Sequence, residues 1–134
     1  MKVEEVMNKK IEYIEPEATV YDAIEKMVDK RIRSLLVNPK DEQDVYGLIT
    51  VRDIVFKIIN KNLNPGKIKV GEITSKPLVC VTKDMPIEHV MALMEKFNIA
   101  RVIVCEEKKV GGIVSIFDVM AGSLIEKARG TRGA

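Results

Sequence analysis

Tryptophan is absent from the 134 residues, which include one histidine, His89, and two cysteines, Cys80 and Cys105. Two cysteines cannot form a disulfide framework or a four-ligand zinc site. Both lie in apolar stretches, which is typical of buried free thiols. A Ser-His-Asp or Cys-His arrangement would have to use His89, which stands in the predicted first turn of a surface helix without a nucleophile motif. The sequence therefore predicts no catalytic residue, no metal site and no enzyme.

Long apolar runs are also absent, since none approaches the roughly 20 residues that span a bilayer. Residues Met1–Glu5 show no apolar signal-peptide segment, so we expect a cytoplasmic protein that does not enter a membrane. Basic residues number 22 and acidic residues 20, and three of those bases lie in the acid-free end Lys127–Ala134. The rest of the chain is close to neutral and aromatic residues make up only 4%, which does not favour a nucleic-acid partner.

What the sequence does contain is an internal repeat. Residues 2–38 align with residues 69–105 at an offset of 67 positions, and residues 45–55 align with residues 110–120 at an offset of 65. The apolar pattern matches throughout, and the change of offset means that the second copy has a shorter loop. The positions identical at the first offset are Lys2, Val3, Glu5, Lys9, Met27, Ile32 and Val37.

Each copy predicts the element order β-α-β-β-α. The elements predicted in the first copy are a strand at 11–14, a helix from Val20 capped by Thr19, strands at 34–37 and 45–50, and a helix from 51 to about 62. Those predicted in the second copy are a strand at 78–82, a helix with Pro86 at its first position, strands at 101–104 and 110–115, and a helix from 116 to about 128. We expect an α+β fold with helices on one face of each small sheet. The predicted division of the chain is 1–66, 67–128 and a flexible tail at 129–134.

The most informative element is the junction between the last strand and the last helix of each copy. It reads Gly47-Leu48-Ile49-Thr50-Val51-Arg52-Asp53 in the first copy and Gly112-Ile113-Val114-Ser115-Ile116-Phe117-Asp118 in the second. A hydroxyl followed three residues later by a carboxylate is a helix-capping arrangement, which requires no further role. The same atoms suit a nucleoside with a phosphate, because a carboxylate accepts vicinal hydroxyls and a helix start offers free N–H donors. Both interpretations remain open at this point.

The sequence resembles a tandem pair of CBS domains, the arrangement called a Bateman module. The resemblance covers residues from about 3 to 125 and rests on the doubled element order, the Thr19-Val20-Tyr21-Asp22-Ala23 helix start and both junctions. It implies two halves packed with pseudo-two-fold symmetry, two clefts between them, and a homodimer. It also implies an adenosine-containing regulatory ligand, either AMP, ADP, ATP or S-adenosylmethionine, with no required cofactor.

Carried over by position, the resemblance implies two ligand clefts. One would use Thr50 and Asp53, with a base pocket from Pro77, Leu78, Val79, Ile99 and Ala100. The other would use Ser115 and Asp118, lined by Ile11, Glu12, Ile32 and Arg33. Arg33 and Arg101 stand where family members often place phosphate-binding residues, although each also suits a solvated strand end. Arg52 could likewise reach a phosphate or remain solvated. We expect the Asp53 cleft to bind nucleotide better, because its base pocket is more apolar and Glu12 would place an acid near the other cleft.

These features predict a regulatory module that senses an adenine nucleotide and signals in trans to an unidentified effector protein. The alternative is a structural dimerisation or interaction module whose junctions are only caps. The alternative predicts that Asp53→Ala lowers stability without changing any binding.

Overall fold

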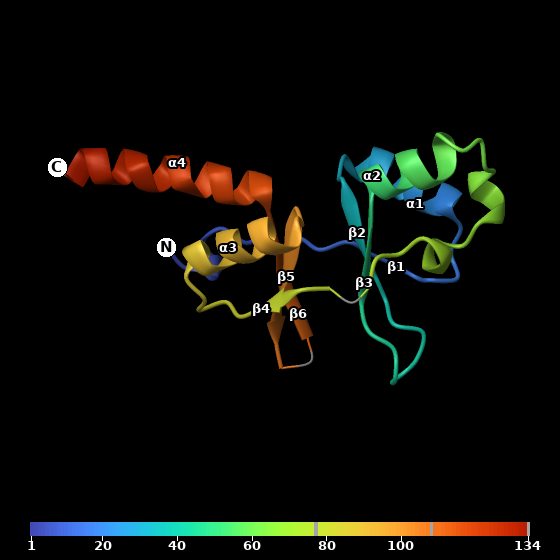
Figure 1. The fold of residues 1–134 in the computed structure, drawn as a ribbon, viewed down its shortest axis with the longest axis horizontal. Coiled ribbons are helices and arrows are strands. Elements are labelled where there is room, and N and C mark those ends of the chain that lie inside the picture. Colours follow the sequence, from blue (N-terminus) through green and yellow to red (C-terminus); the bar gives the residue numbers. More distant parts are fainter. Residues whose placement is uncertain (77, 108, 134) are drawn as a thin grey trace. The chain divides into compact units, whose positions relative to one another are not determined.

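The computed structural model describes residues 1–76, 78–107 and 109–133, with the side chains of 129–133 excepted. The chain divides into two compact units. The first unit is Ile11–Leu78, and the second unit combines Met1–Lys10 with Val79–Ala134 (Figure 1). Among the described residues, no helix is long and apolar enough to cross a membrane.

The first unit is a three-stranded sheet covered on one face by helices. Its elements are β1 (Tyr13–Ile14), α1 (Val20–Lys30), β2 (Ser34–Val37), β3 (Gly47–Thr50) and α2 (Val51–Ile54), which continues as a π-helical turn over Val55–Ile59. The strand order is β1-β2-β3, with β1 parallel and β3 antiparallel to β2. The core between sheet and helices includes Leu35 and Ile49 from the strands, Val20 and Met27 from α1, and Ile58.

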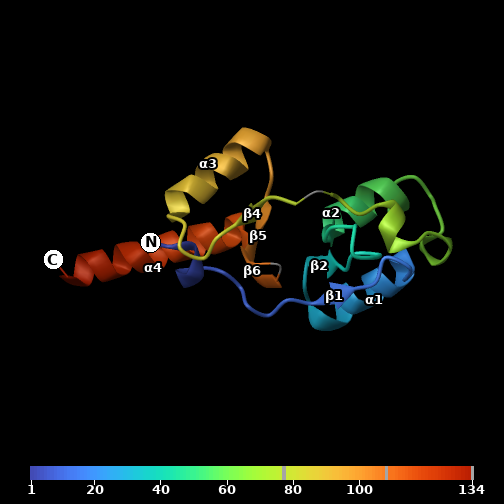
Figure 2. The same ribbon diagram turned by 90° about the horizontal axis from the view of Figure 1, so that it is seen from below.

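The second unit repeats this plan. Its elements are β4 (Cys80–Val81), α3 (Ile87–Phe97), β5 (Arg101–Glu106), β6 (Lys109–Ser115) and α4 (Ile116–Gly133). The order is β4-β5-β6, again with one parallel and one antiparallel pair, and α3 and α4 lie beside these strands (Figure 2). Val81, Val102 and Val114 form its core with Val90 and Met94 of α3. The predicted order β-α-β-β-α and the α+β fold are confirmed in both units.

The predicted helix starts have clear local causes. Thr19 Oγ1 accepts the Asp22 N–H at 3.1 Å, and Asp22 Oδ2 accepts the Thr19 N–H at 3.0 Å, which caps α1 as predicted. Pro86 lies one position before α3 rather than inside it, at φ −61°, where its missing N–H costs no helical hydrogen bond.

A segment from outside each sequence copy completes each sheet. Ser75 exchanges backbone hydrogen bonds with Leu48 at 3.0 and 3.2 Å, and Asn8 does the same with Ile113 at 2.8 and 3.0 Å. The close passage leaves no room for a side chain at Gly47, where a Cβ would lie 2.0 Å from Thr74 Cγ2. The glycine that opens the junction motif is therefore explained by packing.

These crossing segments explain why the compact units are offset from the sequence copies. The start of the first copy, residues 1–10, belongs to the second unit, and the start of the second copy, residues 67–78, belongs to the first unit. The sequence boundary at 66 and 67 marks where the pattern repeats, whereas the compact units are defined by contacts.

The last helix corrects one prediction. Helix α4 continues to Gly133, beyond the end expected near Ala128, while the predicted flexibility of 129–134 stays a prediction. The stretch Leu124–Arg129 consists almost entirely of strong helix formers, which favours continuation. In the first unit the corresponding helix ends at Ile59 rather than near Asn62.

Candidate functional site

The first junction holds its hydroxyl and its carboxylate together at the end of β3. Thr50 Oγ1 accepts the Asp53 N–H at 3.1 Å and donates its own proton to Asp53 Oδ2 at 2.9 Å. The same Oδ2 accepts the Thr50 N–H at 3.1 Å, and the Asp53 side chain is 16% exposed. The pairing of Thr50 with Ser34, and the 3.0 Å bond from the Val51 N–H to the Arg33 carbonyl, fix the turn from strand to helix. The carboxylate is thus rigidly placed by its Oδ2 atom alone.

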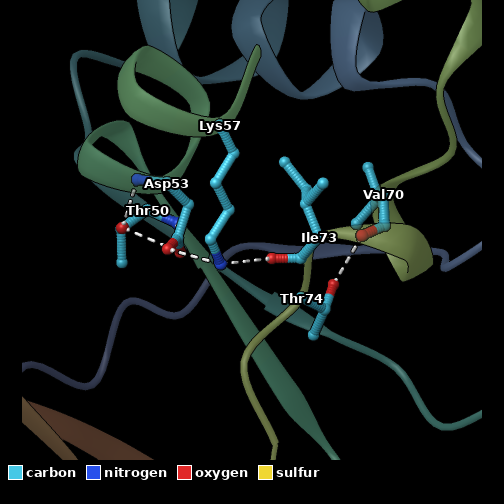
Figure 3. A network of polar contacts seen from close by, with 6 residues as sticks. All are labelled: Thr50, Asp53, Lys57, Val70, Ile73 and Thr74. Carbon is cyan, nitrogen blue, oxygen red and sulfur yellow. Dashed lines mark hydrogen bonds and ion pairs between the residues drawn. The ribbon is translucent and has the colours of Figure 1, made fainter. Parts of the chain in front are cut away.

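The other oxygen of this carboxylate has a different partner. Lys57 Nζ lies 3.3 Å from Asp53 Oδ1 and 3.4 Å from the Ile73 carbonyl (Figure 3). Figure 3 also shows Thr74, whose hydroxyl donates to the Val70 carbonyl at 2.7 Å. Lys57 therefore reaches from the π-helical turn after α2 to the segment around Ile73, and its ammonium group lies against Oδ1 of Asp53.

The second junction reproduces the cap. Ser115 Oγ accepts the Asp118 N–H at 3.1 Å and donates to Asp118 Oδ2 at 2.9 Å, while the Ser115 N–H donates to the same Oδ2 at 2.8 Å. The Ile116 N–H donates to the Ala100 carbonyl at 2.9 Å. In the part of the chain that the structure describes, Asp118 Oδ1 has no hydrogen bond or ion pair. The two junctions thus share a cap and differ at the second carboxylate oxygen.

The physical reason for this difference is one residue. The position that corresponds to Lys57 is Gly122, at the offset of 65. A Cβ at Gly122 would lie 2.4 Å from Val6 Cγ1, so the crossing segment of the second unit packs directly against the helix backbone. A lysine has no space there.

The three arginines that the sequence singled out, Arg33, Arg52 and Arg101, lie in different surroundings. Ser34 and Arg101 pair with Thr50 and Ser115 respectively, so Arg33 and Arg101 each lie beside the junction of their own unit. The Arg52 guanidinium lies over the Phe56 ring, 5.1 Å from its centroid, in a cation–π contact along the helix.

Glu12 has ion-pair partners within its own unit. Its carboxylate lies 3.6 Å from Lys26 Nζ and 3.5 Å from Lys30 Nζ, so the acid is directed toward α1 and is neutralised there. Glu12 therefore gives no reason to expect weaker nucleotide binding at the Ser115–Asp118 junction. The sequence does not indicate that Lys26 and Lys30 pair with Glu12, because it does not show which strand end lies against α1.

The remaining predicted pocket residues are partly buried in their own units. Ile32 packs against the core of the first unit, and Val79 and Ile99 against that of the second. Ile11 and Leu78 are also half-buried, whereas Ala100 is exposed. Pro77 lies outside the described residues. The grouping of these side chains with the junction of the opposite unit stays a prediction.

Sequence reasoning missed Lys57. The signal was present, since Asp53 and Lys57 are four residues apart on a predicted helix, the spacing at which opposite charges pair. Within the described ranges, no group of three or more His, Cys, Asp or Glu side chains is placed to hold a metal ion.

The duplicated α+β unit, with a capped hydroxyl–carboxylate junction in each copy, defines a tandem-repeat module. The chain belongs to the CBS domain family, whose family model matches residues 3–60 and 70–124.

The chain is 33% identical to the uncharacterized protein MK0525 of Methanopyrus kandleri, covering 90% of this chain and 61% of that protein. It is 35% identical to the mitochondrial CBS domain-containing protein CBSX3 of Arabidopsis thaliana, covering 76% of this chain and 51% of that protein. The chain thus spans well under two thirds of these relatives. Among solved structures, the hexameric CBS-CP12 protein from bloom-forming cyanobacteria aligns with a TM-score of 0.87 and 35% identity, covering 95% of this chain and 74% of that one.

Proposed function

We propose that this CBS pair is a regulatory module that binds an adenosine-containing nucleotide at its junctions and signals to a partner protein. The ligand is AMP, ADP, ATP or S-adenosylmethionine. The module itself catalyses no reaction, self-associates as a homodimer and acts in the cytoplasm. The position of the family among regulatory-type proteins supports the first part of this proposal.

The observation that carries the proposal is that the two oxygens of each junction carboxylate have different roles. Capping uses only Oδ2 of Asp53 and Oδ2 of Asp118. The remaining Oδ1 is not needed for the helix, and at Asp118 it has no polar partner among the described residues. A carboxylate that is held rigidly and has one spare acceptor suits vicinal ribose hydroxyls, because it needs no reorganisation to accept them.

This geometry changes the expected ranking of the two sites. At Asp53 a ribose hydroxyl would have to displace the Lys57 ammonium, whereas at Asp118 it would meet an unpaired oxygen. The acid that was expected to weaken the Asp118 site, Glu12, is paired with Lys26 and Lys30. We therefore propose that the Ser115–Asp118 junction binds nucleotide first.

A second candidate, an interaction module with no small ligand, has an observation of its own. Both junctions are complete capping boxes, which stabilise the helix start without any ligand. Exposed apolar side chains also follow α4, including Phe117, Met120 and Leu124 at 61%, 61% and 71% exposure. The hexameric assembly of the CBS-CP12 structure is compatible with either candidate.

Calorimetric titration of the purified chain with each of the four ligands tests the proposal. The variants are Asp118→Asn and Asp53→Asn, and the matched control is Asp22→Asn, because Asp22 forms the same capping box at the start of α1 and belongs to neither junction motif. We expect saturable binding of at least one ligand, lost at the tighter site in Asp118→Asn and retained in Asp22→Asn.

Two results would favour the interaction module. One is the absence of heat, and of any rise in melting temperature, with all four ligands, since a ligand at about 100 times its Kd should add about 2.7 kcal/mol to the free energy of unfolding. The other is equal loss of binding in Asp22→Asn and Asp118→Asn, which would trace the effect to helix capping.

A further inference from the structure

The two cysteines lie on neighbouring strands of the second unit. Cys80 opens β4 and stands in parallel register with Ile103 of β5, and Cys105 follows two residues later on β5. Alternate residues of a strand point to the same face, so Cys80, Ile103 and Cys105 share one face. The opposite face carries Val81 and Val104 into the core under the helices. Cys80 is close enough to Cys105 to raise the pKa of the Cys105 thiol.

The two thiols differ in their surroundings. Cys80 is exposed, whereas Cys105 is half-buried. Burial, together with the smaller effects of the hydrogen bond and charge of Cys80, raises the pKa of the Cys105 thiol to about 12. Cys105 therefore keeps its proton at neutral pH, and an oxidant in solution meets the Cys80 sulfur first.

We propose that Cys80 and Cys105 are a redox-active dithiol that a low-molecular-weight disulfide converts into a cross-link between β4 and β5. The Cys80 thiolate attacks one sulfur of the small disulfide, forms a mixed disulfide and releases one small thiolate. The Cys105 sulfur then attacks Cys80 Sγ, releases the second small thiolate and gives up its proton to it. One small disulfide is reduced to two thiols, and the protein loses two hydrogen atoms.

The backbone at both ends of this cross-link can adjust without loss of the core. Strand β4 is only two residues long, and β5 departs from regular register with β6 between Val104 and Cys105. The Ile103 N–H to Val79 carbonyl bond of 3.0 Å holds the two strands side by side next to the thiols. Cys80 pairs with Ile103, so Cys105 is its diagonal neighbour, and closing the disulfide requires the backbone to move at these two irregular points rather than across a regular sheet.

The test uses the full chain, reduced and then incubated with oxidised glutathione under native conditions. We expect the intact mass to fall by two hydrogen atoms, and peptide mapping without reductant to recover the Cys80 and Cys105 peptides as one species. Dithiothreitol should reverse both changes. The melting temperature should rise on oxidation, because the cross-link restricts the unfolded chain.

The variants Cys105→Ser and Cys80→Ser locate each step. Cys105→Ser should stop at the mixed disulfide with glutathione, and Cys80→Ser should react far more slowly than the wild-type chain. A stable glutathione adduct on the wild-type chain, or cross-linked dimers on a non-reducing gel in place of the intramolecular species, would overturn the proposal. Both readouts are independent of nucleotide binding.

Discussion

Lys57 Nζ lies 3.3 Å from Asp53 Oδ1, and this ion pair distinguishes two junctions that are otherwise built alike. In the second unit the equivalent residue is Gly122, and the carboxylate oxygen of Asp118 that would face it has no polar partner among the described residues. The two copies of the motif thus differ in whether the second carboxylate oxygen forms an ion pair. Asp53 is paired with a lysine four residues along the chain, whereas Asp118 Oδ1 has no polar partner among the described residues.

Removing the Lys57 ammonium should strengthen nucleotide binding at the first junction. We expect Lys57→Met to lower the Kd of the weaker site by up to about fivefold, since a partly exposed ion pair contributes about 0.2–1 kcal/mol. Calorimetric titration measures the change, and Lys61→Met, an exposed position on the same segment, is the control. Weaker binding in Lys57→Met than in the control would mean that Lys57 contacts the ligand, which contradicts its role as a competitor.

A methyl group at Gly122 should lower stability because Val6 occupies its space. The added Cβ would lie 2.4 Å from Val6 Cγ1. Overpacking costs about 1–3 kcal/mol and the gain in helix propensity returns about 1 kcal/mol, so Gly122→Ala should lower the free energy of unfolding by up to about 2 kcal/mol. Urea denaturation measures this difference.

The second variant of the pair, Val6→Ala, supplies the control for the Gly122 prediction. In a Val6→Ala background the clash is removed, so Gly122→Ala should become stabilising through helix propensity alone. An equal effect of Gly122→Ala in both backgrounds would show that the segment Met1–Lys10 does not pack on α4 as described.

The ion pair between Lys76 and Asp44 should make stability depend on acid pH. Both carboxylate oxygens accept from Lys76 Nζ, at 2.9 and 2.8 Å, and this contact, together with backbone hydrogen bonds from Lys40 and Val45, lowers the pKa of Asp44 from 3.8 to about 2. A carboxyl with a lowered pKa stabilises the fold above its unfolded-state pKa, and this contribution is lost as pH falls through the folded-state pKa. The window therefore lies between about pH 4 and pH 2.

The variant Asp44→Asn isolates that contribution. Its melting temperature should lie below that of the wild-type chain at pH 7, and the difference should shrink as the pH falls from about 4 to about 2. Glu42→Gln, on the same loop, should show no such convergence. A pH-independent difference for Asp44→Asn would contradict this prediction, because it would mean that the charge of the Asp44 carboxylate does not contribute to stability.

A charge at Leu124 should weaken self-association without unfolding the chain. Leu124 is 71% exposed on α4 and continues the apolar row of Phe117 and Met120. Burial of one leucine contributes about 1.5–3 kcal/mol, so Leu124→Glu should raise the dimer dissociation constant by more than about tenfold. Sedimentation velocity measures this, with Glu126→Gln as a control on the same helix. An unchanged dissociation constant would exclude this row from the interface.

The fold was readable from local patterns because each element carries its own signals. The strand at 34–37 was predicted with its observed bounds, and the caps at Thr19, Thr50 and Ser115 form the predicted bonds. Capping depends on residues three positions apart, so the sequence contains all the participants. The end of α4 was missed because the glycines after Ala128 suggested a stop.

The ion pairs of the charged side chains could not be predicted from the sequence as well as the fold. Glu12 pairs with Lys26 and Lys30, which are far from it along the chain, and the sequence did not indicate these pairs. Two lysines of α1 reach the start of β1 only because the sheet places that strand end against the helix. Charge pairing across elements depends on that placement.

The sequence by itself determined the repeat, the element order and the hydroxyl–carboxylate pair at each helix start, because periodicity and capping act over a few residues. Only the tertiary structure decided which segment completes each sheet, and therefore why Gly47 and Gly122 have no side chain. It also decided which carboxylate oxygen is free, because Lys57 reaches Asp53 through space that Val6 fills in the other unit. Packing between segments distant in sequence sets these outcomes, and no local pattern encodes it.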